Sequence, residues 1–143
     1  MTLTIQRSHI SDHSIEKVYG VVADVESYQD FIPWCQKSEI VSTDSSNFFQ
    51  ADLKVGLGPL SETYRSHVTC TPHSKIHVLC KEKPLKYLES TWTFEDLPNN
   101  KTKIQYDMHL ALQSSFFQGM IKRVLQESAD QIFKAFDQRL NSL

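Results

Sequence analysis

The stretch DVESYQDFIPWCQKSEI (residues 24–40) decides how the chain is organised, because helix has to give way to strand within it. Pro33 pushes Ile32 away from the helical region of backbone conformation, so a helix ends there and an extended segment begins. This places three large apolar side chains, Phe31, Ile32 and Trp34, together at a corner. Two interpretations of the corner are open: a buried plug that holds a short helix to a sheet, or an exposed apolar rim.

The residues before the corner predict one strand and two short helices. Residues 3–10 (LTIQRSHI) alternate between apolar and polar side chains, as a half-buried strand does. Ser11 or Asp12 then offers an N-cap for a helix over residues 14–25. The apolar side chains of that helix share one face: Ile15, Val18, Tyr19 and Val22. A second short helix over residues 25–32 ends at the corner.

The residues after the corner predict a long antiparallel meander. From the corner to about Gln113 the apolar side chains recur at every second position, the period of a strand. This pattern is broken where Gly, Pro, Asn, Asp and Ser gather, and these residues tolerate turn geometry. The breaks are residues 43–47, 56–59, 71–75 and 96–101.

The last thirty or so residues predict one long amphipathic helix. Ser115 can cap its start, and Gln118, three residues on, completes a capping box. An apolar stripe follows through Phe117, Ile121, Val124, Leu125, Ile132, Ala135 and Phe136.

These elements predict an α+β fold in which a curved antiparallel sheet of six or seven strands wraps around a long C-terminal helix, with two short helices after the first strand. A length of 143 residues is enough for one domain with a real core, so residues 1–143 are expected to form a single domain. A strongly curved sheet cannot touch the helix everywhere. The space left between them is the expected ligand site.

The side chains expected to line this space are the inward alternate residues of four strands and the apolar stripe of the closing helix. Trp92 is the strongest candidate, because a large indole on a curved sheet often borders a space, and the small Ala51 and Ser66 make room beside it. Core packing is the alternative for each residue. The predicted ligand-binding residues are Ala51, Leu53, Val55, Tyr64, Ser66, Val68, Trp92, Phe94, Tyr106, Met108, Leu110, Phe117, Ile121 and Val124.

Catalytic residues are not predicted. The inward faces carry the hydroxyls of Tyr64, Ser66, Ser90 and Tyr106, but neither a His or Cys beside a base nor a pair of carboxylates.

Composition excludes several classes of function. A net charge of −2 with 22% charged residues argues against a nucleic-acid partner. The three cysteines lack the spacing of a zinc site, so we expect no metal and interpret them as buried apolar residues in a reducing compartment. No apolar run approaches the roughly 20 residues that a membrane span needs. Residues 1–10 match neither a signal peptide nor an Arg-rich presequence, so any targeting segment is expected to be absent from this chain or not of a recognisable kind.

Five stretches of the chain together resemble the mitochondrial coenzyme Q-binding protein family, a branch of the START-like, polyketide-cyclase-like helix-grip superfamily. They are VVADVESYQDFIPWC (21–35), ADLKVG (51–56), ETYRSHV (62–68), LKYLESTWTFE (85–95) and AFDQR (135–139), and the likeness extends over nearly the whole chain. The chain departs from the animal proteins of that family at HLALQSS (109–115), where a Phe-rich strand end with an Arg is usual.

The resemblance implies a helix-grip fold and a non-enzymatic carrier or chaperone for ubiquinone and related isoprenoid quinones. It implies ubiquinone as bound ligand with no cofactor, and peripheral contact with the matrix side of the mitochondrial inner membrane. Quinone-biosynthesis or respiratory proteins are implied as partners, in support of respiratory electron transport and efficient quinone biosynthesis. Two alternatives stay open: a cyclase-like enzyme for a small aromatic or polyketide substrate, and a protein-interaction module like bacterial toxins that block ribosomal subunit association.

A quinone carrier has to contact a membrane, and the apolar corner is the part of the chain expected to do so. We expect Phe31, Ile32 and Trp34, together with Phe116 just off the apolar stripe, to form the membrane or cavity rim through which a lipid enters. Trp34 suits an interface because its ring is apolar while its N–H stays wet. The buried plug remains the alternative.

Overall fold

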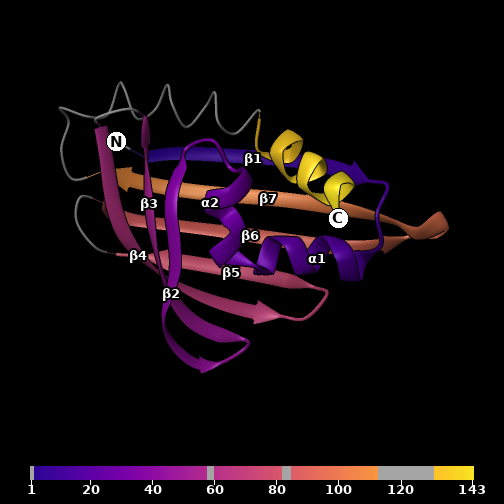
Figure 1. Cartoon of the computed structure of the whole chain (residues 1–143), viewed down its shortest axis with the longest axis horizontal. Coiled ribbons are helices and arrows are strands. Elements are labelled where there is room, and N and C mark those ends of the chain that lie inside the picture. Colours follow the sequence, from indigo (N-terminus) through magenta and orange to yellow (C-terminus); the bar gives the residue numbers. More distant parts are fainter. Residues whose placement is uncertain (1, 58–59, 82–84, 113–130) are drawn as a thin grey trace.

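The computed structural model describes residues 2–57, 60–81, 85–112 and 131–143 (Figure 1). In these ranges seven strands form one antiparallel sheet in the order β1-β7-β6-β5-β4-β3-β2. The predicted α+β architecture is confirmed. The strands are β1 (Thr2–Ser11), β2 (Cys35–Ser45), β3 (Phe48–Leu57), β4 (Leu60–Thr71), β5 (Lys75–Cys80), β6 (Leu85–Leu97) and β7 (Lys101–Leu112), and all but the β1–β7 pair are neighbours in sequence.

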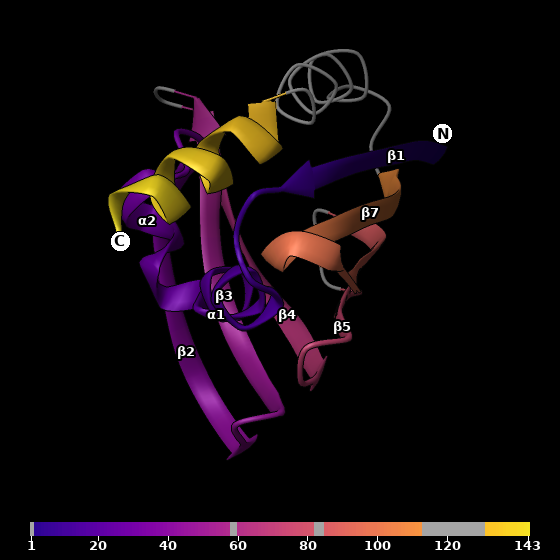
Figure 2. The ribbon, with the colours of Figure 1, turned by 90° about the vertical axis from the view of Figure 1, so that its right-hand side faces the viewer.

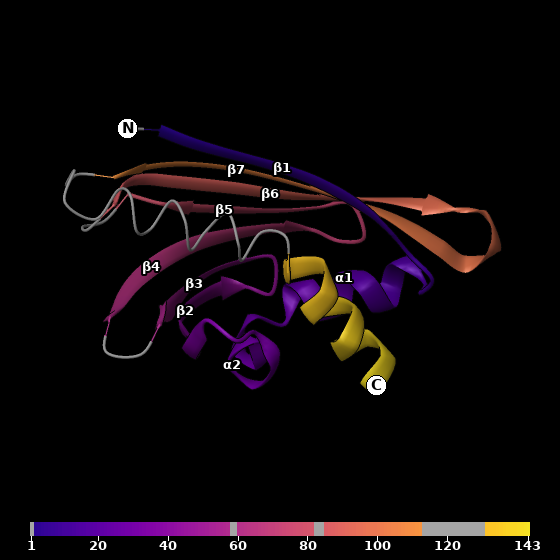
Figure 3. The same ribbon diagram turned by 90° about the horizontal axis from the view of Figure 1, so that it is seen from above.

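The sheet is bent into an open trough, and the helices lie on its concave side (Figures 2 and 3). They are α1 (Ile15–Ala23), the 3-10 turn η1 (Val25–Ser27), α2 (Tyr28–Phe31) and the C-terminal helix, described over residues 131–142. A further 3-10 turn, η2 (Pro98–Asn100), joins β6 to β7. β2 carries three register shifts against β3, and such bulges increase the twist and bend of a strand.

The first helix begins later than the sequence predicts. Ser14 is its N-cap, because the Ser14 Oγ accepts a hydrogen bond from the Lys17 amide at 3.3 Å. Ser11 is instead the last residue of β1, buried and paired with Thr102, so neither Ser11 nor Asp12 caps the helix. The prediction was wrong because the β1–β7 ladder runs further than the alternating pattern alone indicates.

The corner at Pro33 is held firmly to the sheet. Ile32 is extended (φ −89°, ψ 116°), so α2 ends at Phe31 as predicted. The buried Ser38 of β2 fastens the short helices: its Oγ donates to the Glu26 carbonyl at 3.0 Å and accepts from the Gln29 amide at 3.2 Å. The Gln29 side chain in turn accepts from the Ser38 amide at 3.1 Å.

The core lies between the concave face of the sheet and the helices. The predicted inward faces of β3, β4, β6 and β7 are confirmed wherever their side chains are described, for example by Ala51 (0% exposed), Val68 (1%) and Ile104 (2%). All three cysteines are buried, as expected of small apolar residues.

Candidate functional site

A cavity of about 150 Å³, here called the inner cavity, lies between the concave face of the sheet, the corner and the C-terminal helix. Eleven of the eighteen predicted ligand and rim residues border it: Ile32, Trp34, Ala51, Leu53, Val55, Tyr64, Ser66, Val68, Trp92, Tyr106 and Met108. Phe116, Phe117, Ile121 and Val124 lie outside the described residues. Whether the bordering residues bind a ligand stays a prediction.

Two of the predicted ligand-binding residues are buried in the core and do not border the inner cavity. Phe94 is buried at the other end of β6, where its ring packs edge-on against Tyr19 of α1 at 5.7 Å between centroids. Leu110 is 2% exposed and does not border the inner cavity. An alternating strand shows which face is inward, but not how far along that face the helices pack onto the sheet.

The corner is divided between two sides of the molecule. Ile32 is 6% exposed and faces the inner cavity, as a buried plug would, and half-buried Trp34 also borders that cavity. Phe31 turns to the C-terminal helix, where its ring centroid lies 5.2 Å from that of Phe136 and 5.4 Å from the Arg139 guanidinium carbon. The three side chains therefore do not form one continuous rim.

An aromatic cluster forms one wall of the inner cavity. The rings of Trp92 and Tyr106 lie 4.5 Å apart, and Phe136 of the C-terminal helix packs against Trp92 at 5.2 Å. Offset and edge-on packing of this kind fixes ring positions more strictly than aliphatic contact does. The planes of the Trp92 and Tyr106 rings are tilted by 44°, so the wall is a preformed, angled aromatic surface against which another ring can pack.

The polar groups of the inner cavity are uncharged hydroxyls. Among the described residues that line it, none is Asp, Glu, His, Lys or Arg. The Tyr28 hydroxyl donates to the Val22 carbonyl, and the Tyr106 hydroxyl lies 3.4 Å from the Met108 sulfur. The Ser66 Oγ is buried and has no hydrogen-bond partner within the described part of the chain. An unpaired buried hydroxyl is costly, and a ligand acceptor would satisfy it.

Burial keeps these groups protonated. It raises the pKa of Tyr28 and Tyr64 well above the ordinary value, and it raises the pKa of Tyr106 to about 12, against a smaller lowering by a hydrogen bond from Ser90. Burial also raises the pKa of the Cys35 thiol. The lining is therefore neutral at physiological pH, which suits an uncharged ligand with hydrogen-bond acceptors.

These raised pKa values predict a loss of stability in alkali. Below pH 10, the ordinary pKa of tyrosine, the phenol groups of these residues are protonated in both the folded and the unfolded state. Above it the unfolded state releases these protons first, so the free energy of unfolding should fall by about 1.4 kcal/mol per pH unit for each of the three tyrosines. Phenolate absorbance should rise together with the loss of circular dichroism, and Tyr106→Phe should make the fall less steep. Complete ionisation of a still-folded protein near pH 10 would contradict this.

Sequence reasoning missed part of the lining. Ile5, Val25, Tyr28, Cys35, Ile76 and Val78 also border the cavity, together with Leu88, Ser90, Ile132 and Phe136, which belong to the predicted inward strand faces and apolar stripe. Ile76 and Val78 alternate with His77 and Leu79 on β5, the same signal that identified the neighbouring strands. Tyr28 and Cys35 flank the corner, where no periodic pattern exists to show their direction.

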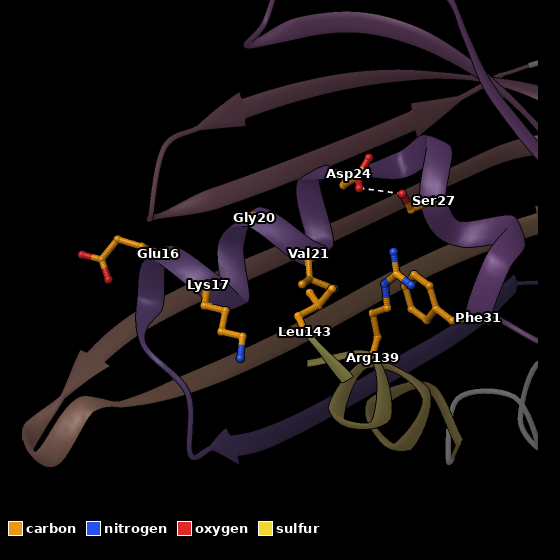
Figure 4. Close-up of a pocket in the computed structure, with 9 residues that line it drawn as sticks. All are labelled: Glu16, Lys17, Gly20, Val21, Asp24, Ser27, Phe31, Arg139 and Leu143. Carbon is orange, nitrogen blue, oxygen red and sulfur yellow. Dashed lines mark hydrogen bonds between the residues drawn. The ribbon is translucent and has the colours of Figure 1, made fainter. Parts of the chain in front are cut away.

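A second hollow of about 250 Å³, here called the outer groove, lies between α1, α2 and the C-terminal helix (Figure 4). It is lined by Glu16, Lys17, Gly20, Val21, Asp24, Ser27, Phe31, Arg139 and Leu143. Only Phe31 among these was predicted to have a functional role.

Over residues 2–57, 60–81, 85–112 and 131–143, no three His, Cys, Asp or Glu side chains gather closely enough to hold a metal ion. In the same ranges no helix is both long and apolar enough to cross a membrane.

Several mitochondrial and bacterial proteins are similar in sequence to this chain. Coenzyme Q-binding protein COQ10 homolog B, mitochondrial, of Xenopus laevis is 32% identical over 130 residues, which cover 82% of this chain and 53% of that protein. Ribosome association toxin RatA of Pseudomonas aeruginosa is 26% identical over 143 residues, which cover 100% of this chain and 99% of the toxin. The chain thus spans about half the length of the Xenopus protein and nearly all of the bacterial one.

Solved structures share the fold at low identity. A START superfamily protein from Mycobacterium smegmatis superposes with a TM-score of 0.84 at 18% identity, over 97% of both chains. The ZhuI aromatase/cyclase from Streptomyces superposes with a TM-score of 0.85 at 16% identity, over 99% of this chain and 94% of that chain. These likenesses confirm the predicted START-like helix-grip fold.

The family model described as polyketide cyclase / dehydrase and lipid transport matches residues 11–137. This range includes α1, α2 and six of the seven strands, and with them nearly every residue around the inner cavity. The chain therefore belongs to the polyketide cyclase / dehydrase and lipid transport family.

Proposed function

We propose that this protein is a non-catalytic carrier or chaperone for ubiquinone-type isoprenoid quinones. The observation that carries the proposal is the inner cavity, whose described lining is uncharged and largely apolar, with one aromatic wall and a few protonated hydroxyls. The names of the coenzyme Q-binding relatives support the choice of a quinone as the ligand.

A quinone ring matches this cavity in shape and in hydrogen bonding. It is flat, so it can pack against one face of the tilted Trp92–Tyr106 pair. Its two carbonyl oxygens only accept hydrogen bonds, and the unpartnered Ser66 Oγ and the protonated Tyr64 hydroxyl are available as donors. The ligand would satisfy a buried hydroxyl, that of Ser66, for which the described residues offer no partner.

The size of the cavity limits how much of the ligand is enclosed. At about 150 Å³ it is below the ~300–1,000 Å³ of typical ligand sites, so it suits the ring rather than a tail of on the order of fifty carbons. Burying such a tail from water at about 0.8 kcal/mol per CH₂ would also exceed any known affinity. The tail therefore stays in the bilayer while the ring is held, and the cargo can be released again.

This mode of binding places the protein at a membrane surface. We assign it to the matrix side of the mitochondrial inner membrane as a peripheral protein, with ubiquinone as bound ligand and no other cofactor. There it would contact quinone-biosynthesis or respiratory proteins and support respiratory electron transport and efficient quinone biosynthesis. The mitochondrial names of the COQ10 relatives support this location.

Titration with a short-chain ubiquinone tests the proposal, because quinones quench indole fluorescence on contact. In a Trp34→Phe background, Trp92 is the only indole, and saturable quenching is expected. Ser66→Ala and Tyr64→Phe should each weaken binding about two- to tenfold, the usual contribution of one hydrogen bond. Thr69→Ala, an exposed hydroxyl on the same strand as Ser66, should bind like the background protein.

The result that would refute the proposal is equally direct. Unsaturable quenching that is the same in all variants would show that the quinone meets Trp92 only by collision. A purified protein that carries stoichiometric quinone from a quinone-containing host, detected by mass spectrometry, is the matching expectation for the native ligand.

Action on ribosomes is the second candidate function. It is favoured by the match to ribosome association toxin RatA, which covers that protein almost completely. Sucrose-gradient sedimentation of ribosomal subunits with the purified protein tests it. A block of subunit association that persists when the inner cavity is filled by mutation would favour this candidate over a quinone carrier.

A further inference from the structure

We infer that the outer groove is where this protein docks onto the phosphate head groups of an anionic membrane. The inference rests on the proposed function for its purpose, because a carrier of membrane quinones has to reach a bilayer. The corner predicted to do this is divided, with Ile32 and Trp34 turned to the inner cavity. Phe31 alone of the corner faces the outer groove.

Two cations of the outer groove have no carboxylate partner among the described residues. Arg139 lies over the Phe31 ring at 5.4 Å and is half-buried, and Lys17 Nζ has only a long contact of 3.5 Å with His13 Nδ1. The guanidinium fork therefore keeps its hydrogen-bond donors free while its position is fixed by the ring beneath it. Two oxygen atoms of one phosphate group can accept hydrogen bonds from the N–H groups of such a guanidinium fork.

Among the described residues, the two acidic side chains of the outer groove form no ion pair with these cations. Asp24 points to Ser27, whose hydroxyl donates to it at 2.6 Å, and Figure 4 shows this pair at the upper edge of the hollow. Glu16 is exposed and its carboxylate points away from the hollow in the same view. A phosphate group can therefore reach Lys17 and Arg139 without displacing a described carboxylate from either of them.

The floor between the two cations is apolar and open. Val21 and the exposed Leu143 lie between Lys17 and Arg139 (Figure 4). Gly20 sits within α1, where glycine is the least favourable residue after proline, yet a Cβ there would meet nothing within 4 Å. Packing does not demand a glycine at this position. Its effect is to leave room beside the helix for the first carbons of a lipid below its phosphate.

The outer groove is also linked to the inner cavity by a line of aromatic contacts. Arg139 packs on Phe31, Phe31 on Phe136 at 5.2 Å, and Phe136 on Trp92 at 5.2 Å. The side chains of Phe31 and Phe136 therefore connect a membrane bound at Arg139 to Trp92, the residue against which the quinone ring would pack.

Vesicle co-sedimentation of the full chain tests this inference. Wild-type protein should bind phosphatidylcholine vesicles that contain cardiolipin, bind pure phosphatidylcholine far less, and be released by high salt. Arg139→Gln and Lys17→Gln should each lower the partition coefficient about fivefold. Lys103→Gln, an exposed cation on β7, should bind like the wild type.

Gly20→Leu separates a blocked groove from a damaged fold. The added side chain meets no neighbour at its Cβ and favours the helix, so thermal stability should be kept or raised while vesicle binding falls. Binding to cardiolipin vesicles that Arg139→Gln, Lys17→Gln and Gly20→Leu all leave unchanged would overturn the inference.

The short-chain quinone titration, repeated on the same variants, keeps the two proposals apart. Normal quinone binding without vesicle binding in Arg139→Gln supports the docking site. Quinone binding by a wild type that ignores anionic vesicles refutes the docking site and leaves the carrier intact. Vesicle binding through the outer groove by a protein that binds no quinone supports the site and refutes the carrier.

Discussion

Replacing Phe136 by Ala is expected to lower the free energy of unfolding by about 3–5 kcal/mol, the usual cost of removing a buried aromatic ring. Phe136 is 3% exposed, and its ring lies 5.6 Å from Tyr28, 5.2 Å from Phe31 and 5.2 Å from Trp92. It is thus the point at which the C-terminal helix meets both the corner and the sheet. A urea titration followed by circular dichroism measures the change.

The control for this substitution lies on the same helix. Gln138 is exposed, so Gln138→Ala should stay within about 0.5 kcal/mol of the wild type. A cost below 1 kcal/mol for Phe136→Ala would show that the C-terminal helix is not held to the sheet through this ring.

Replacing Ala51 by Phe is expected to weaken quinone binding about a hundredfold, close to 3 kcal/mol. Ala51 is 0% exposed and borders the inner cavity, so a larger side chain there takes the space of the ligand ring. Overpacking should cost no more than about 1–3 kcal/mol of stability. The fluorescence titration with short-chain ubiquinone measures the first effect, and thermal unfolding measures the second.

Lys54→Phe provides the matched comparison for the filled cavity. Lys54 lies on the same strand, β3, but is exposed, so a Phe at this position should leave the affinity unchanged. Equal affinities of Ala51→Phe and Lys54→Phe would place the quinone outside the inner cavity.

The sequence allowed the sheet and its inward face to be predicted, because side-chain direction alternates strictly along a strand. Ala51, Ser66, Trp92 and Tyr106 were assigned to the concave face for that reason, and they border the inner cavity. The end of α2 followed from Pro33, whose steric effect is local. These features depend only on residues that are close together in the sequence.

Features that depend on how distant elements press together were not predictable. The position of the helices over the sheet decides that Phe94 is core and that Ile76 borders the cavity. The volume of the cavity is what remains after these side chains interlock, and no periodic pattern encodes it. The pairing of Arg139 with Phe31 likewise joins residues that no sequence spacing connects.

The pairing of β1 with β7 determines the order in which the molecule can assemble. Its register, from Thr2 with Ala111 to Ser11 with Thr102, joins residues about a hundred positions apart, whereas every other strand pair is a local hairpin. During synthesis the first strand must therefore wait, unpaired, until residue 112 has left the ribosome. Because β1 also supplies Ile5 to the inner cavity, the cavity wall needs this pairing as well as the C-terminal helix, which adds Ile132 and Phe136. A nascent chain paused before that point exposes an open strand edge, the kind of surface that chaperones and other nascent chains bind.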